Sequence, residues 1–464
     1  MKRDALEPGL ADDPTLRADP LADATIARIF GPGHPGGPDM ATIALLNAEI
    51  ARWQLNSELD GWRASPGVPA EMAAALEAYV AQARVLPDWA DPAAIARAEV
   101  LFMEMSMVSC TLLFCASLPQ CYVLPDLAAV LHAAGQLEQH TDYRVRATAA
   151  MIFPVMMHGG LTDPSGGGIA QAIKVRLIHA MIRYLVLRGD VADALVAPRR
   201  LPRLLTRGAT MHQALYAHGW DIDRLGLPCN QEELAYTLLT FDYVFLQGLR
   251  RLGLGLDEAD ENAYMHTWNV LGHVIGIERG MMPETMPEAT RMFTAIQAAA
   301  RAQDRTPDPR PALAGALVGT LQSYIPLRLL KPFPVLLTRR LVGKDAARDL
   351  GLNGHVSLLS RVLFVLGFGL VRVVDALGRL VFRGFSISRL VTRILGYNLT
   401  AKLLMDETRP LKLPDALLGQ VNDAVSAWGN DARAPRWMNA IERRFTGRAK
   451  PAPSRTNDAG TALS

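Results

Sequence analysis

Residues 142–187 read DYRVRATAAMIFPVMMHGGLTDPSGGGIAQAIKVRLIHAMIRYLVL, two apolar runs joined by a Gly-rich loop. The runs at 142–157 and 169–187 are rich in helix-forming residues, so both are predicted to be helices, with Pro154 near the end of the first. Because the loop is short, the two helices are expected to form a hairpin. This pair sets the expected fold class, which is all-α.

The rest of the chain is also predicted to be helical. Asp91-Pro92 is an N-cap followed by proline at the first helical position, and Leu118-Pro119 is expected to end the long helix that follows. Alternating strand patterns are scarce, and no repeat of fixed period is visible. Further helices are expected at 93–117, 125–135, 191–199, 208–218, 231–252 and 257–275, the last two capped by Asn230 and Asp257.

Composition also divides the 464 residues into segments. Residues 1–25 are acidic and Pro-rich and are expected to form a flexible N-terminus, and 446–464 a disordered tail. The polar, Pro-rich stretch at 300–312 marks a boundary. We therefore expect a main helical domain over 26–300 and a basic, apolar helical extension over 312–445.

Composition and missing motifs exclude several protein classes. Half of the residues are hydrophobic, so the chain is not a disordered protein, and a net charge of +2 gives no case for nucleic-acid binding. The four cysteines lack CxxC spacing and the N-terminus lacks a secretory signal, so we expect a cytoplasmic protein that is not secreted. Walker, GxGxxG, GxSxG, HExxH and Glu-x-x-His motifs are missing, which disfavours phosphoryl transfer, hydrolysis, zinc and di-iron chemistry.

The basic charge is concentrated in residues 324–393. This stretch is very apolar and carries twelve Lys/Arg and three Asp, a net charge of +9. A spanning helix is disfavoured, because Arg372 and Asp375 would lie near the bilayer centre. Two interpretations stay open: a core helix with one solvated stripe, or a peripheral surface that binds anionic lipid on the inner face of the cytoplasmic membrane.

One constellation indicates a cofactor. Arg176, His179 and Arg183 are spaced by three and four residues, so they share one face of an apolar helix. A neutral imidazole can bind haem iron, and two arginines one turn away can pair with the haem propionates. The alternative is a polar face that makes interhelical hydrogen bonds.

The preceding helix carries a second pair, Arg144 and Thr148, again on one face. A helical hairpin would bring this pair opposite His179, where both side chains would offer hydrogen-bond donors to bound dioxygen. From spacing alone, the simpler interpretation is an exposed arginine and a threonine that a helix tolerates.

These residues form an ordered pattern with two further pieces, Ser117-Leu118-Pro119-x-x-Tyr122 and Trp268-x-x-x-Gly272-x-x-x-Gly276-Ile277. Over residues 40–290 the pattern resembles the haem-dependent oxygenases of the latex-clearing protein (rubber oxygenase) and MpaB type. The resemblance implies a globin-reminiscent all-α fold, non-covalent haem b, dioxygen as co-substrate and oxidative cleavage of C=C bonds in isoprenoid chains.

The resemblance also implies roles for single residues. His179 matches the proximal iron ligand, Arg144 and Thr148 match the distal catalytic pair, and Arg176 and Arg183 match arginines around the haem. One departure concerns the lysine that precedes the distal threonine in rubber oxygenases.

Ala147 stands at that position, so capping of the iron by lysine is not available and polyisoprene as substrate is in doubt. The carboxylate proposed as catalytic base has no clear counterpart, and Asp126 and Glu138 are the candidates.

Two functions remain open. The favoured one is a haem b-dependent oxygenase that acts on a lipophilic, unsaturated, isoprenoid-like substrate. The alternative is a non-catalytic helical protein that binds haem or lipid at the membrane.

Other histidines are rival candidates for the iron ligand. His266 and His273 are seven residues apart and share a helix face, so they are the main rivals. His158, His212 and His218 are weaker candidates.

Overall fold

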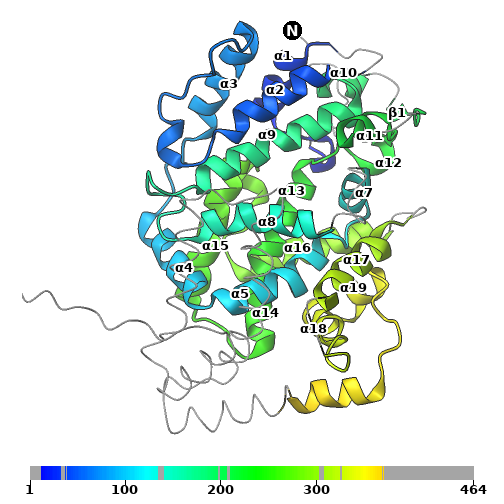
Figure 1. Cartoon of the computed structure of the whole chain (residues 1–464). Helices are drawn as coiled ribbons and strands as arrows, with labels where there is room; N and C mark the ends of the chain where they lie inside the picture. The colour runs from blue at the N-terminus through cyan, green and yellow to red at the C-terminus, as the bar shows by residue number, and fades with distance from the viewer. Residues whose placement is uncertain are drawn as a thin grey trace, which may run out of the picture.

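A computed structural model describes residues 12–32, 37, 39–133, 141–196, 199–205, 210–302, 308–323, 325, 327–367 and 369, except the side chains of 106–107 and 141–147. The expected tail at 446–464 and most of the basic stretch beyond 367 lie outside these residues. The all-α prediction is confirmed (Figure 1), because the strands within the described residues are β1 (Arg200–Leu201) and β2 (Trp220–Asp221), which pair antiparallel.

The elements follow one another in this order. The first half contains η1 (Pro14–Leu16), α1 (Pro20–Phe30), α2 (Met40–Ala51), η2 (Asn56–Leu59), α3 (Ala70–Ala83), α4 (Pro92–Glu104), α5 (Ser106–Leu112), the π-helix η3 (Leu113–Ser117), α6 (Leu118–Cys121), α7 (Pro125–Ala133), α8 (Thr141–Met156) and α9 (Gly168–Leu187). The second half contains α10 (Val191–Val196), α11 (Met211–Ala217), α12 (Ile222–Leu225), α13 (Gln231–Phe241), α14 (Tyr243–Leu252), α15 (Glu258–Ile275), η4 (Arg279–Met281), α16 (Met286–Ala302), α17 (Arg310–Ser323), α18 (Phe333–Val342) and α19 (Lys344–Asp349).

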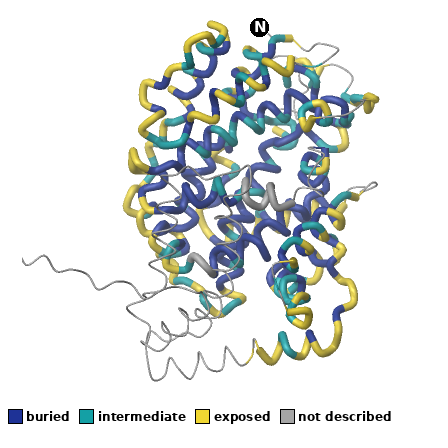
Figure 2. Tube along the Cα trace, in the orientation of Figure 1, coloured by how far each residue is buried: buried dark blue, intermediate teal, exposed yellow. Residues whose placement is uncertain are grey.

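Helix α9, which we call the central helix because of its many neighbours, crosses the upper half of the molecule in Figure 1. It packs against α8, α1, α15 and α11, and its buried apolar side chains belong to one hydrophobic cluster. The same cluster includes Leu313 and Leu317 from α17 and Leu341 from α18. Figure 2 shows that buried stretches of the chain run through the interior of the molecule. The described part of the expected extension therefore packs onto the core of the main domain.

The predicted hairpin of α8 and α9 forms through a tightly held loop. The side chain of Asn56 donates to the carbonyls of Gly160 and Asp163 at 2.9 Å and accepts the N–H of Ile169 at 3.1 Å, so it caps α9 from a distant segment. A Cβ on Gly160 would lie 2.2 Å from the Pro154 carbonyl oxygen, so only glycine allows this approach. The loop thus fixes the position of α9 relative to α8.

Residues 12–25, part of the segment expected to be flexible, form η1 and the start of α1 in the structure. Asp19 caps α1 by accepting the N–H of Ala22 at 3.3 Å, and Pro20 occupies the first helical turn. Burial of Ala22 and Ile26 fixes α1 against α9. Polar composition does not reveal this packing, because the acidic side chains of Asp19 and Asp23 have partners on α9.

The long helix predicted over 93–117 is also wrong in detail. The helix is interrupted at Met105, and the axes of the helices before and after this residue form a bend of 86°. Pro119 does not end the run, because it stands in the first turn of α6, where the missing N–H costs nothing. The run predicted over 231–252 is likewise divided at Asp242 into α13 and α14.

Within the described residues, no single helix has both the length and the apolarity needed to cross a bilayer. One bent pair, 92–104 with 108–121, meets the criterion only when its two helices are taken together.

Candidate functional site

The polar face of α9 carries Arg176, His179 and Arg183. Arg176 binds the carboxylate of Asp19 with two hydrogen bonds, from Nε at 2.5 Å and from Nη2 at 2.8 Å. Its Nη1 donates to the carbonyl of Val274 at 3.2 Å, near the C-terminus of α15. A guanidinium at that end also interacts favourably with the helix dipole, so Arg176 joins α1, α9 and α15.

Gly276 makes room for this ion pair. It follows α15 with a φ of +94°, and a Cβ there would lie 2.5 Å from Oδ2 of Asp19 and 2.8 Å from Nε of Arg176. Gly272, one turn earlier, lies where a Cβ would meet the sulfur of Met282 at 2.6 Å. The glycine spacing of the Trp268 motif therefore serves close packing and the approach of an ion pair.

Arg183 is completely buried. Its Nη1 donates to Asp23 at 2.9 Å, and its Nη2 donates to the carbonyl of Cys229 at 3.0 Å. Burial raises the pKa of Asp23 to about 7, although the nearby Arg183 opposes this shift. The two arginines thus hold α1 against α9 through Asp19 and Asp23. A contact with haem propionates would require these ion pairs to open, so that role stays a prediction.

His179 lies between the two arginines and differs from both. Its Nδ1 is buried, and the ring has no hydrogen-bond or ion-pair partner among the described residues. Burial, helped by the charge of Arg183, lowers its pKa to about 4, so the imidazole is neutral at pH 7 and keeps a lone pair for a ligand. The side chain is half-buried, so the protein does not enclose the ring completely. An unpartnered neutral imidazole at this depth fits an iron ligand.

The rival histidines have other surroundings. Nε2 of His266 accepts the backbone N–H of Asp91 at 2.9 Å, and the rings of both His266 and His273 pack against Trp89. Nδ1 of His218 lies 2.8 Å from the carbonyl of Gly219, and His158 is exposed beside Glu99. These contacts favour structural roles for the four histidines. The His179 ring, by contrast, forms no hydrogen bond with any residue that the structure describes.

The expected distal pair lies on α8, which packs along α9. Arg144 and Thr148 share one face of α8 through their spacing, and Thr148 is half-buried. The side chain of Arg144 lies outside the described part of the structure. Its role toward dioxygen therefore stays a prediction.

Asp126 has the properties expected of a proton acceptor. It is buried at the start of α7, and burial raises its pKa to about 6, although the N–H of Leu127 donates to it at 2.8 Å. Burial raises the pKa of Glu232 to about 7 and that of Glu233 well above its usual value, and the nearby Asp126 adds to both shifts. Glu138, the other carboxylate considered from the sequence, lies outside the described residues.

Sequence reasoning missed the partners of the arginines, Asp19 and Asp23. One signal was available, because Asp19-Pro20 has the same pattern as the helix start at Asp91-Pro92. A helix beginning there places Asp19 and Asp23 on one face, one turn apart. Nothing in the sequence indicates that this face meets α9.

Comparison with known proteins identifies the relatives of this chain. The domain family described as "ER-bound oxygenase mpaB/B'/Rubber oxygenase, catalytic domain" matches residues 102–375, more than half of the chain. The chain belongs to this family. The matched range includes His179, Arg144 and Asp126 and part of the basic stretch, whereas Asp19 and Asp23 lie before it.

Two individual relatives agree with this assignment. The rubber oxygenase of Streptomyces sp. (strain K30) is 23% identical over 280 residues, which cover 60% of this chain and 57% of that protein. The structure of latex clearing protein Lcp in the closed state has a TM-score of 0.56 at 18% identity and covers 90% of this chain and 91% of its own. At this identity, the structural likeness establishes the fold alone. The family resemblance predicted from the motifs is therefore confirmed.

Proposed function

We propose that this member of the family is a haem b-dependent oxygenase that uses dioxygen on a lipophilic, unsaturated, isoprenoid-like substrate. The observation that carries the proposal is the unpartnered, neutral His179 at the middle of the central helix. Its neighbours on the same face of α9, Arg176 and Arg183, are bound by Asp19 and Asp23 and form no hydrogen bond with the ring. A buried polar atom without a partner is costly, so a ligand for the imidazole is expected.

The residues around this position divide the work. His179 would hold the haem through its neutral ring, and a haem held there would supply the dioxygen chemistry. Arg144 and Thr148 on α8 would donate hydrogen bonds to dioxygen bound between α8 and His179. Asp126 would accept a proton from the substrate, because a carboxyl with a pKa of about 6 is ionised for a large part of the time near neutral pH.

The ion pairs of Arg176 and Arg183 would position His179 and would take no direct part in the reaction. Arg176 and Arg183 anchor α9 one turn before and one turn after His179. The position of the imidazole relative to the rest of the protein would therefore be fixed. The expected products are carbonyl compounds, as oxidative cleavage of a C=C bond implies. The identity of the cleaved bond is a question for product analysis.

The decisive experiment is the absorption spectrum of the protein purified from haem-replete cells. We expect a Soret band that shifts on reduction and on addition of carbon monoxide. His179→Ala should lose most of the band while the helical circular dichroism stays intact, because one coordination bond holds the cofactor.

Matched controls are His266→Ala and His273→Ala, which should keep the band, since these rings pack against Trp89. The reverse pattern would refute the assignment of the site. Arg144→Ala should keep the haem and slow turnover of an unsaturated terpene. A protein with a normal haem band and no turnover of such compounds would instead support a non-catalytic haem-binding role.

A further inference from the structure

A surface around residues 327–367 combines exposed apolar side chains with positive charges that have no ion-pair partner among the described residues. Half of the exposed large hydrophobic side chains in the described residues lie here. Their exposed fractions are 61% for Leu327, 42% for Leu329, 74% for Leu358, 58% for Leu359, 43% for Val362, 66% for Val365 and 63% for Leu366. We call these seven side chains, with Arg328, Lys331 and Arg361, the basic apolar surface.

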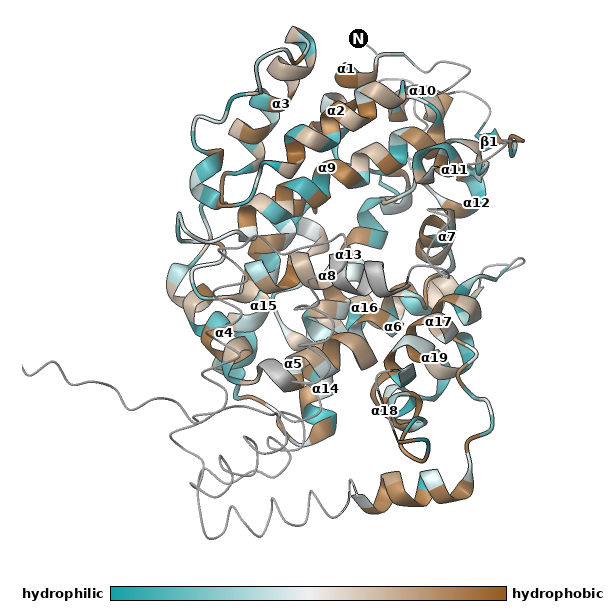
Figure 3. Cartoon of the chain, viewed as in Figure 1, coloured by the Kyte–Doolittle hydropathy of each residue, from teal (hydrophilic) through white to brown (hydrophobic). Residues whose placement is uncertain are grey.

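Five of the apolar side chains belong to the helix at 358–367. It lies at the lower edge of the molecule in Figure 1, away from the main body, and Figure 3 shows it as mostly hydrophobic. It has ten residues, so its length is about 15 Å, half the thickness of a bilayer core. A short apolar helix that is exposed along most of its length is suited to lie in an interface and not to cross it.

The surface is continuous between the helix and the segment before α18. The hydroxyl of Ser360 donates to the carbonyl of Leu329 at 3.1 Å, and the rings of Phe333 and Phe364 are 5.5 Å apart. The exposed leucines of both segments therefore form one patch. Patches of this kind mark interaction sites, whereas single exposed leucines do not.

The charges on this surface have no acidic partners within the described residues. Arg328, Lys331 and Arg361 are exposed, and none of them forms an ion pair with another residue that the structure describes. The two nearest acids along the chain pair elsewhere, Asp345 with Arg348 at 3.2 Å and Asp349 with Arg301 at 2.9 Å. A binding partner that matches this surface would therefore carry both apolar groups and negative charge.

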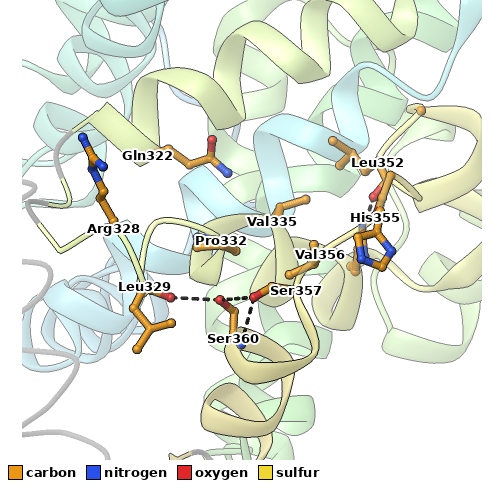
Figure 4. A pocket seen from close by; sticks show the side chains of 13 residues that line it. Gln322, Arg328, Leu329, Pro332, Val335, Leu352, His355, Val356, Ser357 and Ser360 are labelled. Atoms are coloured by element: carbon orange, nitrogen blue, oxygen red, sulfur yellow. Dashed lines mark hydrogen bonds between the residues drawn. The ribbon is translucent and has the colours of Figure 1, made fainter.

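A cavity of about 610 Å³ opens beside the patch (Figure 4). Its wall includes Arg328, Arg339 and His355, together with the apolar side chains of Leu329, Val335 and Val356. Arg339 donates to the carbonyl of Gly354 at 2.6 Å, which holds the loop after α19 in place. Cationic and apolar groups meet in this cavity, as phosphates and acyl chains meet at a membrane surface.

We propose that the protein docks on anionic phospholipid membranes through the basic apolar surface, with the helix at 358–367 lying in the lipid interface. The proposal does not depend on haem binding, and His179→Ala should dock as the wild type does. A lipophilic substrate dissolved in the same bilayer would then be supplied to the protein at high local concentration.

The test is flotation of the full chain with liposomes of phosphatidylcholine alone or with phosphatidylglycerol. We expect flotation only with the anionic lipid, and less of it in high salt. Leu359→Gln/Val365→Gln should lower the binding constant at least about tenfold, because both side chains lose contact with lipid. Arg328→Gln/Arg361→Gln should lower it at least about fivefold.

Matched controls come from other exposed positions. Val85→Gln/Val196→Gln and Arg203→Gln/Arg291→Gln change the same kinds of side chain elsewhere and should bind as the wild type does. Equal flotation on neutral and anionic vesicles, or equal loss in the controls, would overturn the proposal. No flotation together with a dimer that Leu359→Gln/Val365→Gln dissociates would also overturn it, because the patch would then bind a second copy.

Discussion

The central helix α9 and the basic apolar surface use arginine in opposite ways. On α9, Arg176 and Arg183 are bound by Asp19 and Asp23 inside the protein. On the basic apolar surface, Arg328 and Arg361 are exposed without an acidic partner among the described residues. The first arrangement uses charge to fix one helix, and the second leaves charge available to a partner. In both regions, the proposed function rests on a group without a partner among the described residues: His179 on α9 and the cations on the surface.

The strongest test of this difference is removal of the buried arginine. Arg183→Met should lower the free energy of unfolding by about 3–5 kcal/mol, because Asp23 and the Cys229 carbonyl lose their donors in a buried site. Urea denaturation followed by circular dichroism measures this loss. The control is Arg199→Met, which breaks the exposed pair with Asp223 and should cost about 0–1 kcal/mol. Similar losses for both variants would show that burial does not distinguish the two pairs.

A second test of this difference uses a buried carboxyl that has no basic partner in the part of the chain that the structure describes. Asp242 between α13 and α14 is completely buried, and burial raises its pKa from 3.8 to about 7. Between about pH 4 and 7 the folded protein keeps a proton on Asp242 that the unfolded chain releases, so this group lowers stability as the pH rises. The stability of the wild type relative to Asp242→Asn should therefore fall across this window, by at most about 1.4 kcal/mol per pH unit.

The measurement is the difference between the unfolding free energies of the two proteins at several pH values. The Asp242→Asn variant keeps a side-chain oxygen that can accept the Tyr243 N–H, so the helix start should be preserved. Parallel pH profiles would contradict the raised pKa of Asp242.

The smallest expected effect lies on the exposed surface. Leu366→Ala should change the free energy of unfolding by no more than about 0.5 kcal/mol, because the side chain is 63% exposed. Leu317→Ala, on the buried face of α17, is the matched control and should cost about 2–5 kcal/mol. Thermal and urea denaturation of both variants measure the contrast. A large loss for Leu366→Ala would mean that this side chain is packed and not available for lipid.

The sequence alone determined the helical class, the hairpin of α8 and α9, and the position of His179 on a helix face. These features depend on local rules: residue propensity, cap residues and the spacing of side chains around a helix. Ordered motifs from several helices were enough to indicate the family, which the match over 102–375 confirms. They also indicated which residues share a face.

Only the tertiary structure decided what each face meets. Arg176 and Arg183 were correctly placed on one face with His179, but their observed partners are Asp19 and Asp23, more than 150 residues earlier. The bend at Met105 and the cap that Asn56 gives to α9 have the same origin. Such contacts arise from packing between segments far apart in the chain, and helix periodicity carries no information about which distant segment fills a given face.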